Sequence, residues 1–91
     1  MKIIDSMTRQ YLGAAFERCP QTYREIVVPM QACGAFRDGS KLDIALDFCG
    51  RASRVLGRTV TVYENADRVF DEVERRLSRA YTSHAENAGN G

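Results

Sequence analysis

The chain has 91 residues, the size of one domain, and its 13 basic and 12 acidic residues leave a net charge of +1. This balance excludes a strong general attraction to nucleic acids or anionic membranes. The hydrophobic fraction of 44% is close to the globular average and argues against wholesale disorder. We therefore expect one compact domain over residues 1–81 and a small, polar, flexible tail over 82–91.

The N-terminus and the cysteines predict the compartment. The first ten residues lack the apolar stretch of a secretory signal, and the longest apolar run, IVVPM, is far too short to cross a bilayer. Cys19, Cys33 and Cys49 match neither a zinc pattern nor a disulfide framework, so we expect buried, reduced thiols. These features predict a cytoplasmic protein with no membrane partner, no metal and no cofactor.

The first predicted helix covers residues 6–18, with Ser6 as its cap and an end before Pro20. Two short segments on either side of it are strand candidates. KII at 2–4 could form an edge strand, and REIVV at 24–28 is either a strand or a helical turn. Pro29 would break either element.

The stretch LDIALDFC at 42–49 fits both a strand period and a helix period. Extending the pattern to residue 57 favours a helix over 40–56, because the apolar residues then fill one continuous arc of about 200°. Ser40 suits the N-cap with Asp43 three residues on, and Gly57 suits the left-handed residue after the last turn.

The last predicted helix covers residues 66–81, where the apolar residues form one stripe and the charges lie outside it. Asn65 is its expected cap. Acids and arginines at the i, i+4 spacing predict the intrahelical pairs Asp71–Arg75 and Glu72–Arg76. TVTVY at 59–63 alternates and is β-branched, which is typical of a strand.

These elements predict an α+β fold in which three amphipathic helices pack on a small sheet of two or three strands. The alternative is an all-α three-helix bundle in which 59–63 is an extended connector.

Motifs that could support catalysis are incomplete. GAFRDGSK at 34–41 resembles a phosphate-binding loop, but Ser40 and Lys41 stand in the reverse order. The only histidine, His84, lies in the predicted tail, too far along the chain to be expected beside a cysteine. Asp43 and Asp47 share a solvated helix face, where nothing separates their pKa values for acid–base work. We therefore predict that the chain is not an enzyme.

Two sets of residues on helix 40–56 remain as candidates for binding. The chain has eleven arginines, and Arg51, Arg54 and Arg58 line the second half of this helix and its exit. The apolar arc is wider than one packing partner needs, so part of it could meet another chain; the candidates are Ile44, Phe48 and Val55.

The function predicted from these sets is that of a small interaction protein, such as an adaptor, inhibitor or regulator, which binds another protein. Small inhibitors encoded by phages and other mobile elements of bacteria fit this description. A nucleic-acid-binding regulator that uses the arginine face is the alternative, and formation of a homodimer stays open.

Overall fold

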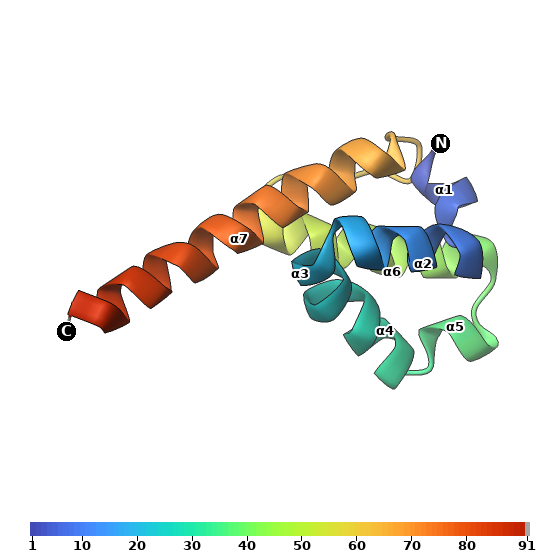
Figure 1. Ribbon diagram of the computed structural model, residues 1–91. Coiled ribbons are helices and arrows are strands. Elements are labelled where there is room, and N and C mark those ends of the chain that lie inside the picture. The colour runs from blue at the N-terminus through green and yellow to red at the C-terminus, as the bar shows by residue number, and fades with distance from the viewer. Residues whose placement is uncertain (91) are drawn as a thin grey trace.

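The computed structural model describes the backbone of residues 1–90, together with the side chains of these residues other than Asp38 and 81–90. All regular structure in this part of the chain is helical (Figure 1). The elements are α1 (Ile3–Ser6), α2 (Arg9–Arg18), α3 (Pro20–Thr22), the π-helical turn η1 (Tyr23–Val27), α4 (Val28–Ala32), α5 (Ala35–Asp38), α6 (Lys41–Leu56) and α7 (Ala66–Asn90). The predicted α+β fold is therefore wrong, and the all-helical alternative is the one that fits.

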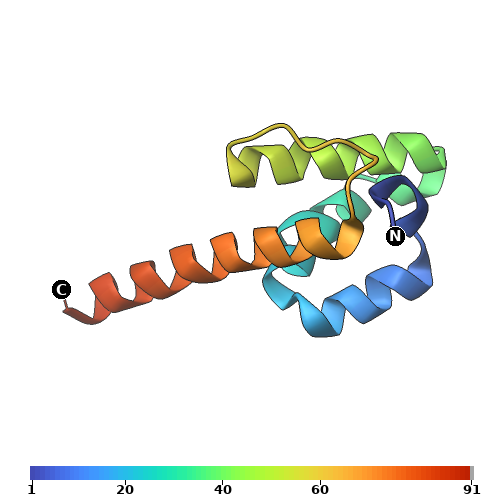
Figure 2. The same cartoon turned by 90° about the horizontal axis from the view of Figure 1, so that it is seen from above.

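The helices form layers around the first half of α7. Figure 2 shows α6 along one edge of the body, α2 along the opposite edge and the start of α7 between them. Phe70 of α7 links the layers: its ring stacks on Phe48 of α6 with centroids 4.9 Å apart, and it meets Tyr11 of α2 edge-on at 5.5 Å. All three rings thus join one core, since aromatic rings favour stacked or edge-to-face contacts. The second half of α7 projects beyond this body.

Helix α6 confirms the prediction made from LDIALDFC. The backbone N–H of Asp43 donates to Ser40 Oγ at 3.1 Å, and the Ser40 N–H donates back to Asp43 Oδ2 at 3.3 Å. This reciprocal capping box satisfies two donors that a helix start leaves open. Gly57 ends the helix at φ 68°, in the left-handed region where a residue without Cβ is not strained.

The strand candidate at 24–28 is helical instead. Residues 20–32 form one continuous helical stretch, and the turn η1 widens it immediately before Pro29. Proline lacks an N–H and its ring clashes with the carbonyl four residues earlier, so a regular α-helix would be broken there. In the wider turn, the N–H of Val28 donates to Tyr23 O, five residues back. The π-helical turn therefore lets the helix continue past the proline.

The strand candidates at 59–63 and 2–4 form no sheet within residues 1–90. Their segments do lie side by side: Ile3 N donates to Glu64 O and Ile4 N donates to Val62 O, both at 3.0 Å. The pairing is limited to one isolated antiparallel bridge between Lys2 and Asn65, because α1 begins at Ile3 and turns the chain away. Residues 57–65 are thus a connector between α6 and α7.

The two remaining helix predictions are partly confirmed. The helix predicted at 6–18 is split into α1 and α2, and Thr8 rather than Ser6 accepts the capping bond, from Tyr11 N at 3.1 Å. Asn65 caps α7 as predicted, by accepting from Arg68 N at 3.1 Å. The backbone of α7 continues beyond Tyr81, whereas the side chains over 82–91 lie outside the described residues, so the flexible tail stays a prediction.

Candidate functional site

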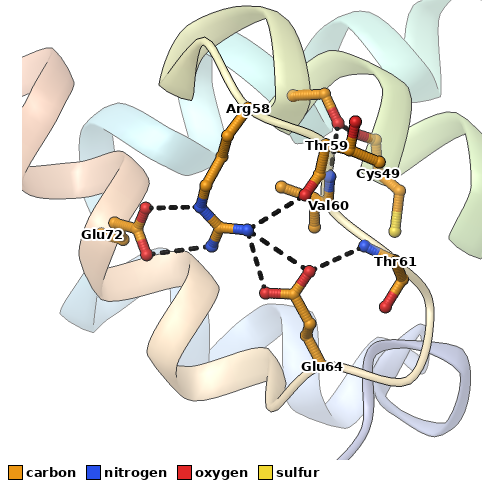
Figure 3. A network of polar contacts seen from close by, with 8 residues as sticks. Cys49, Arg58, Thr59, Val60, Thr61, Glu64 and Glu72 are labelled. Carbon is orange, nitrogen blue, oxygen red and sulfur yellow. Dashed lines mark hydrogen bonds and ion pairs between the residues drawn. The ribbon is translucent and has the colours of Figure 1, made fainter.

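Arg58 lies at the centre of a polar cluster where α6, the connector and α7 meet (Figure 3). Its Nε and Nη2 donate to the two carboxylate oxygens of Glu72, both at 3.0 Å. Its Nη1 donates to Thr59 O at 3.1 Å and to both oxygens of Glu64, at 3.1 and 3.3 Å. Glu64 in turn accepts from Thr61 N at 2.8 Å. Arg58 therefore holds the connector against α7 and is committed to two carboxylates.

The charges in this cluster stabilise one another. The hydrogen bond from Arg58 lowers the pKa of Glu72, and the hydrogen bond to Glu72 raises the pKa of Arg58 further above its already high value. A bidentate pair of this kind is the stronger form of ion pair. It is still partly hydrated, since the Arg58 side chain is 39% exposed, so we assign it a structural role at the surface.

The other two predicted arginines do not join Arg58 in one binding face. Arg51 Nε donates to Asp47 Oδ1 at 3.0 Å within α6, and its Nη2 lies 3.7 Å from Cys33 Sγ. Arg54 is exposed and makes no ion pair with a described side chain. Among the described side chains, Arg54 is therefore the one of the three arginines that is not paired with an acid.

The predicted apolar residues of α6 face inward. Phe48 is fully buried, Ile44 is almost fully buried and Val55 is half-buried. Leu42 and Leu46, from the edge of the same arc, are 46% and 53% exposed. The exposed apolar surface of α6 therefore differs from the one predicted, because α7 packs against the middle of the arc.

A pocket of about 440 Å³ opens between α2, η1, α4, α5 and the start of α6. Its lining is mixed: the apolar and aromatic residues Met7, Leu12, Tyr23, Phe36 and Ile44 lie beside Thr8, Arg9, Gly13 and Gln31. Gly13 matters for its shape, since a Cβ built there would meet no atom within 4 Å. A larger residue at this position of α2 would project into open space beside the pocket.

Aromatic side chains shape one side of this pocket. The ring of Tyr23 meets Phe16 edge-on with centroids 4.8 Å apart, and its hydroxyl accepts from Gln31 Nε2 at 3.3 Å. Phe16 is itself 54% exposed, so an apolar ring stands in solvent beside Tyr23. The sequence reasoning missed this site. Its available signal was a glycine inside the apolar pattern YLGAAF, where a helix gains nothing locally from glycine.

The structure also shows where the residues of the incomplete catalytic motifs lie. The residues between Gly34 and Gly39 form the short helix α5, and Ser40 serves as the cap of α6. Cys19 and Cys49 are buried as expected, whereas Cys33 is exposed, so the expectation of a buried thiol is wrong for Cys33. Burial raises the pKa of the Cys49 thiol to about 11. The side chain of His84 lies outside the described residues.

In the described part of the chain, no group of three or more His, Cys, Asp or Glu residues is placed to hold a metal ion. No described helix is both long and apolar enough to span a membrane. No protein-family model, no curated protein and no solved structure matches the chain.

Proposed function

We propose that the chain is a small, non-enzymatic protein-binding module that takes apolar side chains of a partner protein into the pocket beside α2. The observation that supports this proposal is the pocket itself, which combines a volume of about 440 Å³ with five apolar or aromatic side chains set among polar ones. Grooves of this character are a common way to recognise an amphipathic segment of another protein.

The neighbouring residues strengthen the proposal. Phe16 is a large exposed ring beside Tyr23, and aromatic residues are enriched at the centres of protein interfaces. Gly13 leaves open space beside the pocket, although alanine at this position would give a more stable helix. Both features lower the stability of the isolated protein, the first by exposing an apolar ring to water and the second by placing glycine within a helix. Contact with a bound partner would offset this loss of stability.

The test compares two leucine substitutions on α2. Gly13→Leu places a side chain at the pocket, whereas Ala14→Leu places the same side chain on an exposed neighbour that does not line the pocket. Each variant is immobilised and incubated with lysate of the source cells, with and without nuclease. We expect wild type and Ala14→Leu to capture the same protein and Gly13→Leu to lose it. Equal capture by all three proteins would contradict the proposal.

A second candidate function is nucleic-acid binding. It is favoured by the partners that the acidic residues of α7 bind, because these partners lie outside α7. Asp71 lies 3.3 Å from Arg18 and Glu72 pairs with Arg58, so neither makes the intrahelical pair predicted from spacing. Glu72 is the acid on the face of α7 that carries three arginines, and its two carboxylate oxygens already bind Arg58. The electrostatic effect of Arg68 and Arg75 also lowers the pKa of Glu72. Among described side chains, the arginines of this face, Arg68, Arg75 and Arg79, make no ion pair.

The salt dependence of binding tests this second function. If the α7 arginines contact phosphates, log K for single- or double-stranded DNA falls linearly with log salt concentration. Arg75→Ala combined with Arg79→Ala would then reduce the magnitude of that slope by roughly 2. Arg51→Ala serves as the matched control, since Arg51 is paired with Asp47. An unchanged slope in the double variant would end this candidate.

A further inference from the structure

The outer face of α6 carries an apolar stripe that the described part of the chain covers only in part. Leu42, Leu46 and Gly50 follow one another at a spacing of four residues and lie on the same side of the helix. Both leucines are about half exposed, and Gly50 is exposed as well. Figure 2 shows α6 at the edge of the body with no other helix on its outer side. We call these three residues the outer stripe.

Gly50 has no role inside the single chain that explains it. A Cβ built there would meet no atom within 4 Å, and its backbone is not in the left-handed region. Glycine in a helix interior lowers helix stability relative to alanine. A glycine on an exposed helix face does, however, let the backbone of a second helix come close, and the next exposed residue one turn earlier is Leu46.

The charges beside the outer stripe indicate which helix could lie there. Asp43 and Arg54 both flank the stripe on the same side, Asp43 near the start of α6 and Arg54 near its end. Asp47 and Arg51 are already paired with each other, and Arg54 makes no ion pair among described side chains. An antiparallel copy of α6 would place Arg54 opposite Asp43, and symmetry would repeat the pair at the other end.

We propose that the outer stripe binds the outer stripe of a second copy of this chain, with the two α6 helices antiparallel across a two-fold axis near position 48. The register that sets Asp43 opposite Arg54 also sets Leu46 opposite Gly50, because both pairs are centred near residue 48. The partner's leucine then has space over the glycine, and each copy supplies both halves of every contact. The shape, the apolar character and the charges of this face of α6 thus all fit the same antiparallel arrangement.

The dimer is expected to be weak and to leave the α2 pocket open. The stripe and its flanking charges span residues 42–54, about 18 Å of helix at 1.5 Å per residue. Such a contact is at the small end of specific interfaces, so dissociation constants between about 1 µM and 1 mM are expected. Ile44, which lines the pocket, lies on the opposite side of α6 from the stripe. The dimer would therefore present two pockets to partners.

Sedimentation equilibrium of the full chain, up to about 1 mM, tests the proposal. Wild type is expected to be in monomer–dimer equilibrium. Arg54→Glu makes the flank wholly acidic and Asp43→Lys makes it wholly basic, so each variant alone should dimerise about tenfold more weakly or worse. An equimolar mixture should recover a dimer containing one copy of each, because both pairs are then restored. Circular dichroism checks that each variant stays folded, since Asp43 also belongs to the capping box.

A substitution of Gly50 distinguishes an effect on self-association from an effect on folding. Gly50→Gln is expected to raise the melting temperature of the monomer through its better helix propensity, yet to weaken the dimer about tenfold by filling the space for the partner's Leu46. Gly13→Ala, a similar change on α2, should raise the melting temperature without weakening the dimer. A wild type that stays monomeric at about 1 mM overturns the proposal and assigns the stripe to a different partner. A dimer unaffected by Arg54→Glu and Gly50→Gln overturns it too.

Discussion

The two faces of α6 carry similar apolar residues, but these residues differ in how far they are buried. On the inner face, Phe48 is fully buried and stacks on Phe70 of α7. On the outer face, Leu46, two positions earlier, keeps 53% of its surface in water. Both belong to one apolar arc in the sequence. The difference shows that an arc reports how much apolar surface a helix carries, while the neighbouring elements decide which part of it is covered.

The connector lies against the end of α6 near Ser53. Residues 57–65 lead from the end of α6 to the start of α7 without adding a strand or a helix. Arg58 binds Glu64 and Glu72 and so holds this segment close to α7. Val60 N donates to Ser53 Oγ at 2.9 Å, and Ser53 Oγ donates to Cys49 O at 2.6 Å. The connector therefore covers the end of α6 near Ser53, whereas Leu42 and Leu46, nearer the start of the helix, stay about half exposed.

The largest expected effect distinguishes the two faces by stability. Phe48→Ala should lower the free energy of unfolding by about 3–5 kcal/mol, because it removes a fully buried ring from the contact with Phe70. Leu46→Ala, on the outer face, should change it by no more than about 0.5 kcal/mol. Urea unfolding at low protein concentration, where the chain is monomeric, measures both. Equal losses in the two variants would mean that the faces are misassigned.

A smaller effect is expected where the connector is held. Glu72→Gln removes one carboxylate from Arg58 and should cost about 0.5–1 kcal/mol at pH 7, since the pair is partly hydrated. The pKa of Glu72 is lowered in the folded chain, so its stabilising effect is present above the ordinary glutamate pKa of about 4.3. The effect is lost as the pH falls through the lowered value. Unfolding of wild type and variant should therefore converge below about pH 4; a constant difference would contradict this origin.

The smallest perturbation compares a buried cysteine of α6 with an exposed cysteine at the end of α4. Cys49 is buried with a pKa raised to about 11, whereas Cys33 is exposed beside Arg51. Iodoacetamide at neutral pH should modify Cys33 at least about tenfold faster than Cys49, because the thiolate reacts and because access to Cys49 needs local opening. Mass spectrometry of digests over time measures the two rates. Similar rates would show that the inner face opens readily.

Local signals in the sequence determined several elements of this protein correctly. Ser40, Asp43 and Gly57 marked both ends of α6, and Asn65 marked the start of α7. These predictions hold because a helix cap and a helical period involve residues only three or four positions apart. The apolar arc of α6 was also predicted correctly, but Phe48 and Ile44, which were candidates for contact with another chain, lie in the core of this one.

Only the tertiary structure decided the fold class and the location of the proposed binding surfaces. The segment 24–28 became a π-helical turn, and 59–63 made a single bridge rather than a sheet, although both had strand-like composition. Thr22 N donates to Glu74 at 2.8 Å and Arg18 pairs with Asp67 at 3.2 Å, contacts between residues about 50 positions apart. Neither spacing nor composition encodes such contacts, because they arise only when the helices pack. The packing that includes these long-range contacts leaves the α2 pocket open and the leucines of the outer stripe about half exposed.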